Sequence, residues 1–509
     1  MSDGQIDNLP YQRSLKRRSA RGDAPERTSR AGDGPSLTER IDRASAAYER
    51  AAKPFIVQFF IFLLILPVSF ALGPIRLTFP RLFLLVMFVP LIVRWLMGRY
   101  GGIIAADLLL VAHAAWHFLI ISFHHGVTKA SEFSTVAAVE LLGAYFLARV
   151  YIRDRTSFLF FAKCAFWTLV VLLPFAMIES LTRQMLISNI IGAIPGLTAF
   201  ENVGYEPRMG LYRAQVTFEH PILFGVFCSS LFSVAWFALS RPDASLFARG
   251  MRAFFPFLGT FFSLSSGALV SILVQGILIG WDFVTKTLKK RWNILALIFL
   301  AMYVTIDLLS NRSPAQIFIS FGTFNSATAW NRILIWEYGS AEVIRNPIFG
   351  LGLKDWQRPH WMVASTDNYW LLVAMRFGLP GFALMASAFF LAMRGVAKMD
   401  FGNRPELLAC QKAYMTSVFG TFIAMCTVHM WGGTFLFVVF MLASGIWMFT
   451  QPEDVGPRRR GAAARGDDGD DAREASSERS TSRRRGAQEN RSRSRQHGAA
   501  TRRRGPADN

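Results

Sequence analysis

The sequence has few cysteines and, over most of its length, few charged residues. Only four cysteines occur among the 509 residues. All four lie in or beside apolar runs, so we expect them to be packed rather than joined in a disulfide framework. Roughly one residue in nine is charged between residues 54 and 450, and nearly half of all charges lie in the two ends, 1–53 and 451–509. The net charge of +20 therefore does not describe the apolar middle, which excludes a soluble basic domain that binds nucleic acid.

Several motifs of soluble enzymes are also missing. The sequence has no glycine-rich phosphate loop for nucleotides, no zinc-protease motif and no Gly-x-Ser-x-Gly elbow. His113, His117, His124 and His125 are close together in the sequence, but no matching carboxylate or cysteine lies nearby on the same side. We therefore expect these histidines to pack or to face the membrane interface, and we predict no metal site and no cofactor.

The chain has instead a series of long apolar runs that are almost free of charge. A run of about 20 residues matches the ~30 Å hydrocarbon core of a bilayer at about 1.5 Å per helical residue. We predict an all-α polytopic membrane protein with about twelve transmembrane helices. The predicted spans are 54–72, 77–97, 102–122, 133–151, 157–178, 220–240, 251–264, 267–284, 292–309, 368–393, 413–430 and 433–450.

The distribution of basic residues predicts the orientation of these spans. Short cytoplasmic loops of membrane proteins accumulate Lys and Arg, and alternate loops of this chain do so. The run 251–284 has basic flanks on both sides and contains Ser263-Leu-Ser-Ser-Gly267, so we interpret it as two short helices. Both termini are then cytoplasmic, and two long loops, 179–219 and 310–367, lie outside.

The two ends of the chain are predicted to be disordered cytoplasmic tails. Residues 1–53 mix basic and acidic side chains, and residues 451–509 contain repeated arginine runs among Asp, Ser and Gly, so neither segment can bury a core. Attraction to anionic membrane lipid is the simplest function for the arginine runs, with RNA or a protein partner as the alternative.

Most of the outward basic residues lie in the two long outer loops, against the usual bias. An anionic ligand on the outer face would explain them, although long loops translocate largely regardless of charge. In the first loop, Arg208, Arg213, Glu219 and His220 come just before a span, at the depth of the membrane surface. Guanidinium groups there suit a phosphate or pyrophosphate. The alternative is that Arg213 pairs with Glu219 or with lipid headgroups.

The second long loop contains a predicted amphipathic helix over 329–344. This helix carries Arg332 and places Ile333, Trp336 and Ile344 facing inward, on or near the membrane. A tight turn is predicted after it, at Pro347, Gly350 and Gly352, and the same loop holds two further basic candidates, Arg345 and Arg358.

Motifs between residues 200 and 390 follow one another in a characteristic order. They are Arg208-Met-Gly-Leu-Tyr-Arg213 with Phe218-Glu-His-Pro221, the Ser-rich turn before Gly267, Asn331-Arg332 with Asn346-Pro-Ile-Phe-Gly-Leu-Gly-Leu353, and Tyr369 with Phe377-Gly-Leu-Pro-Gly381. In this order and in its twelve-span layout, the chain resembles the O-antigen ligase and polymerase superfamily of bacterial inner-membrane glycosyltransferases.

The resemblance implies a GT-C-like helical membrane fold and a reaction. A glycan would pass from undecaprenyl diphosphate to an acceptor hydroxyl on the outer face, without metal or nucleotide sugar. Arg213 and Arg332 fall where the family has arginines that handle the lipid diphosphate. Candidate substrate-binding residues beside them are Arg208, Glu219, His220, Arg345, Arg358 and Asn368.

Two positions depart from the family pattern. The family often has Ser-Arg-Gly at the short turn, where this chain has Ser265-Ser-Gly267, so one phosphate ligand is absent. The family commonly has His before Asn at the span after the large loop, where this chain has Asp367-Asn368. A carboxylate can accept the proton of the acceptor hydroxyl, so Asp367 is a candidate base, with His360 as the second candidate. The alternative for Asp367 is a helix cap.

The leading functional prediction is polymerisation of undecaprenyl-diphosphate-linked glycan repeats, in exopolysaccharide or O-antigen synthesis. The alternatives are an O-antigen ligase, which transfers glycan to lipid A core, and, in another class, a polysaccharide transporter or flippase. The expected partners are the lipid-linked glycan, a glycan or lipid A acceptor and membrane lipid, with flippase and chain-length regulator proteins as further candidates. No nucleic acid partner is expected.

Overall fold

The computed structural model describes most of the region between the tails. The described residues are 55–72, 75–98, 102–195, 197–204, 206–311, 314, 316–317 and 326–451. The predicted tails, apart from Gln451, and the loop residue Arg312 lie outside them. All described residues belong to one compact unit, Pro54–Asn509.

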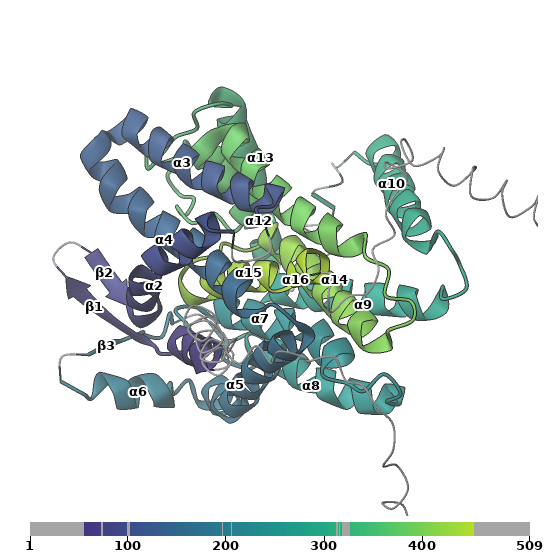
Figure 1. The fold of residues 1–509 in the computed structure, drawn as a ribbon. Helices are drawn as coiled ribbons and strands as arrows, with labels where there is room; N and C mark the ends of the chain where they lie inside the picture. The colour runs from purple at the N-terminus through teal and green to yellow at the C-terminus, as the bar shows by residue number, and fades with distance from the viewer. Residues whose placement is uncertain are drawn as a thin grey trace, which may run out of the picture. The chain divides into compact units, whose positions relative to one another are not determined.

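The described part of the chain is a bundle of apolar helices (Figure 1), which confirms the prediction of an all-α polytopic membrane protein. Nine of its helices are long and apolar enough to cross a membrane. They are α2 (Phe79–Leu96), α3 (Ala105–His125), α4 (Val127–Tyr151), α5 (Arg155–Thr182), the segment Pro221–Ala238, which joins α7 (Pro221–Ser230) to the π-helix η1 (Val234–Ala238), α9 (Ser266–Val284), α10 (Arg291–Leu309), α13 (Tyr369–Ala397) and the segment Gly432–Thr450, which joins α15 (Gly432–Ser444) to α16 (Trp447–Thr450).

Three other predicted spans are helical but fall outside these nine. They are the ten-residue helix Phe55–Leu64, the 17-residue α8 (Leu246–Phe262) and α14 (Pro405–Met425). The break predicted inside 251–284 is confirmed, because α8 ends at Phe262 and α9 begins at Ser266.

The first predicted span, 54–72, is wrong beyond Leu64. Proline has no backbone N–H and disfavours helix at the preceding residue, and Pro67 stands where the helix has ended. The chain continues as strand β1 (Val68–Leu72), which pairs antiparallel with β2 (Ile75–Thr78) and with β3 (Thr198–Ala199). This small sheet joins the start of the bundle to the loop after α5 (Figure 1).

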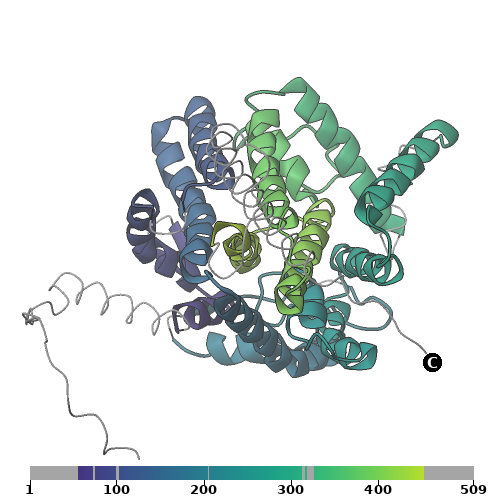
Figure 2. The ribbon, with the colours of Figure 1, turned by 45° about the vertical axis from the view of Figure 1, so that its right-hand side comes forward.

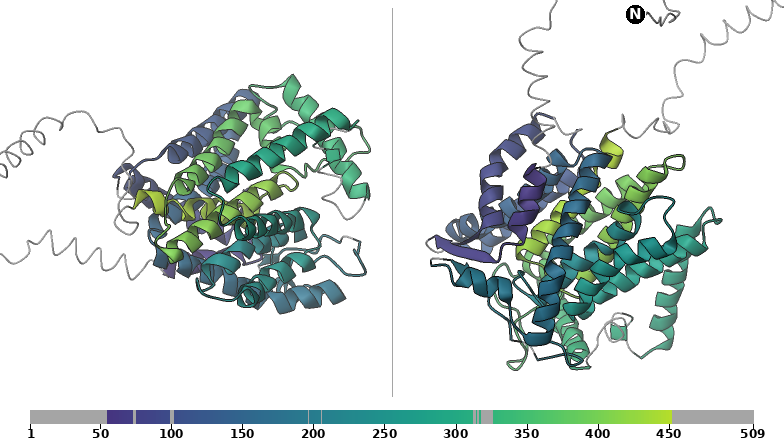
Figure 3. Two further views of the ribbon diagram at one scale, coloured as in Figure 1. Left: turned by 90° about the vertical axis from the view of Figure 1, so that its right-hand side faces the viewer. Right: turned by 90° about the horizontal axis from the view of Figure 1, so that it is seen from below.

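The helices pack around a core of aromatic and small side chains. α3 packs against α4 and α13, and α7 packs against α8, α9 and α14 (Figure 2, Figure 3). A buried ion pair ties α3 to α4: Arg149 Nη2 lies 3.2 Å from Asp107 Oδ2, and Tyr145 donates a 2.7 Å hydrogen bond to Asp107 Oδ1. Because every charged group in this network has partners, the network can be buried.

α10 is the exception to close packing. Leu295 is its one buried residue. Its first turn is fastened to the end of α9, where Arg291 pairs with Asp282 at 2.8 Å and Trp281 donates to the Arg291 carbonyl at 3.2 Å. In Figure 1 the helix stands apart from the packed bundle.

The turn predicted at Pro347–Gly352 is locked to a kink in α13. We call these two segments, 347–352 and 375–379, the clip. Three main-chain hydrogen bonds join them: Leu351 N to Met375 O at 2.8 Å, Gly352 N to Arg376 O at 2.9 Å, and Leu379 N to Pro347 O at 2.7 Å.

Glycine is required in the clip because the backbones touch. Gly378 has φ +68°, and a Cβ there would lie 2.0 Å from the Ile348 carbonyl oxygen. A Cβ on Gly350 would lie 2.5 Å from the Arg376 carbonyl oxygen. The motifs Asn346-Pro-Ile-Phe-Gly and Phe377-Gly-Leu-Pro-Gly381 therefore form one close backbone contact. This contact fixes the end of the helix that directly precedes Asn346.

Candidate functional site

Arg213 is held in place by main-chain bonds on both sides. Tyr212 N donates to the Ser180 carbonyl at 2.8 Å, and Ala214 N donates to the Phe262 carbonyl at 2.9 Å. Glu179, at the end of α5, accepts from the next two backbone N–H groups, those of Gln215 and Val216, at 3.0 and 2.8 Å. The loop before α7 is therefore fixed on α5 and α8, and Arg213 leaves it at a defined point.

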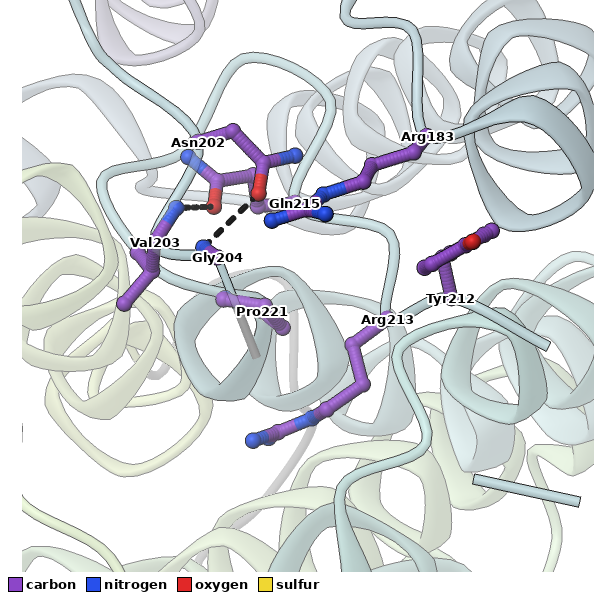
Figure 4. A pocket seen from close by; sticks show the side chains of 8 residues that line it. All are labelled: Arg183, Asn202, Val203, Gly204, Tyr212, Arg213, Gln215 and Pro221. Atoms are coloured by element: carbon purple, nitrogen blue, oxygen red, sulfur yellow. Dashed lines mark hydrogen bonds between the residues drawn. The ribbon is translucent and has the colours of Figure 1, made fainter. Parts of the chain in front are cut away.

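Arg213 is one of the residues that line a small space beside this loop. That space measures only about 10 Å³, roughly one water. Gln215 also lines it, accepts a hydrogen bond from Val203 N at 3.3 Å and donates one to the Glu201 carbonyl at 2.9 Å (Figure 4). Figure 4 shows Arg183 reaching toward Gln215, whereas the guanidinium of Arg213 extends the other way. Arg213 is buried and donates from Nε to the Ser263 carbonyl at 3.4 Å.

The turn between α8 and α9 contacts two arginines of the first loop, Arg208 and Arg213. Arg208 Nη1 donates to the Leu264 carbonyl at 2.9 Å, one residue after the carbonyl that Arg213 contacts. The next two residues, Ser265 and Ser266, are 1% and 3% exposed, and their hydroxyl oxygens have no hydrogen-bond partner among the described residues. They stand at the N-terminus of α9, where a helix dipole favours negative charge.

Arg332 brings a third guanidinium to this place from α12 (Ser326–Arg345). It is 6% exposed, and within the described chain its Nε and Nη1 have no hydrogen-bond partner. Burial lowers its pKa; the carboxylate of Asp367 opposes this shift, and the charge of Arg208 adds to it. A buried cation with unused donors costs free energy, so its presence indicates a requirement other than stability.

The charge of Asp367 acts on Arg332. Asp367 is not the cap of the helix that follows it. α13 begins at Tyr369, and its cap is Asn368, whose side-chain oxygen accepts from Leu371 N at 3.0 Å. The capping alternative for Asp367 is therefore wrong by one residue. Asp367 accepts a 3.3 Å hydrogen bond from the Ser365 hydroxyl and is only partly buried. The side-chain oxygen of Asn368, by contrast, is occupied by the helix cap.

His429 is a partly buried polar residue beside Trp431 that the sequence analysis did not select. It lies between α14 and α15; its ring stacks on Trp431 at 5.1 Å and on Tyr369 at 6.4 Å. Its Nδ1 is buried, with no partner among the described residues. Burial first, and then the charge of Arg376, lower its pKa to about 4. The available signal was His429-Met-Trp-Gly-Gly433, a polar residue and two glycines between the last two apolar runs.

His220 also contacts Trp431, the residue on which His429 stacks. Its ring meets Trp431 edge-on at 5.6 Å, and its Nδ1 accepts from Ile222 N at 3.0 Å, which caps α7. Burial, followed by the charge of Arg213, lowers its pKa to about 4. His220 is therefore neutral near pH 7 and serves as a cap, in contact with the arginine site.

The other predicted candidates are engaged elsewhere in the second loop. Arg345 is exposed and pairs with Glu342 at 3.0 Å. Arg358 pairs with Asp355 at 2.6 Å, which lowers the pKa of that carboxyl, and donates to the Met362 carbonyl at 3.2 Å. His360 is exposed. Arg345 and Arg358 therefore stabilise the loop, and among the described residues no ion pair joins either of them to Arg332.

The helix predicted over 329–344 is present as α12. Trp336 and Ile344 are 39% and 77% exposed. α12 packs on α13 rather than lying free, so Leu334 and Ile335 are buried instead, against Leu371 and Met375. Arg332 lies on this same buried side of the helix.

The histidines of α3 are used in packing, as predicted. His113 Nδ1 contacts the Gly381 carbonyl at 2.9 Å, His117 Nδ1 contacts the Ser134 hydroxyl at 2.8 Å, and His125 Nε2 accepts from Leu353 N at 2.9 Å. The last contact ties α3 to the segment that follows the clip.

The fold and the gathered arginines together define a polytopic helical membrane protein with a candidate anion site built from loops. Residues 252–386 match the family model described as O-antigen ligase. This match confirms the resemblance of the chain to the O-antigen ligase and polymerase superfamily. The matched region contains the turn before α9, Arg332, the clip and Asp367, whereas Arg208 and Arg213 precede it. No curated protein matches the chain.

Proposed function

We propose that the protein polymerises undecaprenyl-diphosphate-linked glycan repeats on the outer face of the bacterial inner membrane, with both termini in the cytoplasm. The observation that carries the proposal is the buried guanidinium of Arg332, whose unused donors lie in the electrostatic range of Asp367 and Arg208. A diphosphate accepts such donors bidentately and carries the opposite charge.

The site residues divide the reaction between them. Asp367 takes the proton of the acceptor hydroxyl as its oxygen forms a bond to the anomeric carbon of the donor glycan. The bond from that carbon to the diphosphate oxygen breaks, and the diphosphate leaves with the electron pair. Negative charge then grows on the leaving group, where Arg332 and Arg213 stabilise it most in the transition state.

The turn before α9 completes the anion site. Family members often carry an arginine in this turn, and here Ser265 and Ser266 offer hydroxyls at a helix N-terminus instead. Helix N-termini bind phosphate through backbone N–H groups and the helix dipole. We therefore assign one phosphate to Arg332 and the other to this turn with Arg213.

The decisive experiment is transfer by purified protein supplied with a defined undecaprenyl-diphosphate-linked repeat. Wild-type protein should produce lipid-linked polymer, and Arg332→Ala should produce little. Equal rates for the two proteins would refute the assignment. Trp167→Ala is the control, because this residue of α5 is 61% exposed and does not belong to the proposed site. It should transfer glycan at the wild-type rate.

A ligase is the second candidate, because the matching family includes this reaction as well. The donor chemistry is the same, and only the acceptor differs. Deletion of the gene separates the two reactions. Loss of polymer with single repeats retained on the surface indicates a polymerase, whereas lipid-linked polymer that never reaches lipopolysaccharide indicates a ligase. A transporter is disfavoured, because the family match concerns O-antigen transfer and the polar residues gather in loops.

A further inference from the structure

A second hollow in the described chain differs in character from the arginine site. It measures about 520 Å³, within the roughly 300–1,000 Å³ of small-molecule sites. Its walls come from the small sheet, the loop after β3 and the residues before α7 and α15. Thr78, Arg81, Thr198, Glu201, Glu219 and Trp431 line it.

The charge of this cleft excludes a phosphate ligand. Arg81 is its one cation among the lining residues, and it is paired with Glu140 of α4. Glu201 and Glu219 are carboxylates, which would repel an anion. Carboxylates and threonine hydroxyls accept hydrogen bonds from ligand hydroxyls, so the lining suits a neutral, hydroxyl-rich molecule.

Trp431 gives the cleft a flat apolar surface. Its ring is fixed by His429, stacked at 5.1 Å, and by His220, edge-on at 5.6 Å. A fixed, half-buried indole beside hydrogen-bonding groups suits the C–H face of a pyranose, since that ring has one apolar face and hydroxyls at its rim.

Glu219 connects the cleft to the arginine site. Its carboxylate lies against Gly432, where a Cβ would come within 2.8 Å of Glu219 Oε1, and the next residue is His220, which senses the charge of Arg213. Gly432 has φ +56° and no side chain, so Glu219 can sit beside Trp431. A molecule in the cleft would therefore lie next to the proposed diphosphate site.

We propose that this cleft binds a pyranose unit of the acceptor glycan, with Trp431 stacking on the ring and Glu201 and Glu219 holding its hydroxyls. The inference rests on the proposed function, which requires an acceptor hydroxyl to reach the donor at the arginine site. The same chemistry would recognise the end of a growing repeat polymer or the core sugar of a lipopolysaccharide.

Binding of lipid-free sugar to the purified full-length protein tests the cleft without the reaction. Two probes are used: repeat oligosaccharide released from the surface polysaccharide of the producing cell, and core oligosaccharide from its lipopolysaccharide. Loss of one aromatic stacking contact corresponds to about tenfold weaker binding, so Trp431→Ala should weaken binding of the recognised probe by about that factor. Glu201→Gln, at an exposed loop residue, should weaken it without risk to folding.

The control variants separate the two proposals. Trp167→Ala should bind the probe like the wild type, and Arg332→Ala should also bind it while losing transfer. In the transfer reaction, Trp431→Ala should raise KM for the acceptor more than it lowers kcat. The cleft assignment is wrong if neither probe binds the wild type. It is also wrong if the recognised probe binds Trp431→Ala and Glu201→Gln as tightly as it binds the wild type. Retained transfer by Arg332→Ala would instead overturn the proposed function.

Discussion

Arg208 and Leu264 are joined by a 2.9 Å hydrogen bond from the guanidinium Nη1 to the carbonyl oxygen. Leu264 is fully buried and has φ +45°, a conformation that L-residues rarely adopt. The strained turn before α9 is thus held to the first loop by a cation of the site. Strain of this kind persists only when the surroundings over-determine it, and it clusters at functional sites.

Arg332→Met should abolish transfer while leaving the protein as stable as before, or more stable by about 1–2 kcal/mol. The substitution removes two buried donors that have no partner among the described residues, whose desolvation costs about that much. Thermal unfolding in detergent and the transfer assay check this together.

Arg149→Met is the matched comparison, because Arg149 is a buried arginine with partners. It leaves Asp107 uncompensated in the core and should cost about 3–5 kcal/mol of stability. A large loss of stability in Arg332→Met would show that Arg332 is a structural residue after all.

Substitutions at Asp367 and Asn368 should have different effects, because we expect the first residue to act in catalysis and the second to cap α13. Asp367→Asn should lower kcat by at least about a hundredfold, the usual contribution of a general base, with little change in melting temperature. Asn368→Ala removes the hydrogen bond to Leu371 N and should cost about 1 kcal/mol of stability.

Asn368→Asp is the rescue variant, since aspartate also caps helices. It should restore the stability that Asn368→Ala loses. Full activity of Asp367→Asn at substrate saturation would rule out this carboxylate as the base.

Gly378→Ala should prevent the clip from closing. The added methyl group would lie 2.0 Å from the Ile348 carbonyl oxygen, so either the backbone must move or the three hydrogen bonds must break. We expect a loss of more than about 2 kcal/mol and poor yield of folded protein.

Gly276→Ala, on α9, is the control, because nothing lies within 4 Å of its added Cβ. Alanine favours a helix over glycine by about 1 kcal/mol, so this variant should be at least as stable as the wild type. Size-exclusion profiles and melting temperatures of the two variants distinguish a local clash from a general intolerance of alanine.

Acid should destabilise the protein between about pH 6.5 and pH 4 through His220 and His429, whose pKa values fall from 6.5 to about 4 in the folded state. In this range the unfolded chain binds more protons than the folded one, so stability is present above pH 6.5 and is lost as the pH falls. The groups that face these rings include Arg213, Arg376 and Trp431.

Melting temperature measured from pH 7.5 to pH 4 checks this effect. His429→Gln removes one titrating group and should flatten the curve over that interval. Identical pH profiles for the variant and the wild type would contradict the assignment of His429 as buried and neutral.

Most of the helices were predictable, because long apolar runs indicate membrane spans. The strand Val68–Leu72 was not, since it is as apolar as the helix before it and only Pro67 marks the change. The sheet also depends on pairing with Thr198–Ala199, some 130 residues away, and no local pattern reveals such a partner.

The site was predictable in part. Arg208, Arg213, Arg332 and Asp367 could be selected because charged groups at the ends of apolar runs need a reason to be there. The orientation of α12 could not be read from periodicity, since the helix packs on α13 and presents Leu334 and Ile335 to it. His429 escaped because it falls inside the apolar window 413–430, where a single polar residue changes the average little.

The weak packing of α10 has a mechanical consequence for the site. α10 is attached to the bundle at its first turn by Arg291 and Asp282, and Leu295 is its one buried residue. α12 is fastened instead to α13, through the contacts of Leu334 and Ile335. Among the described residues, the contacts that hold α12 come from α13, so the position of the Arg332 guanidinium does not depend on the packing of α10.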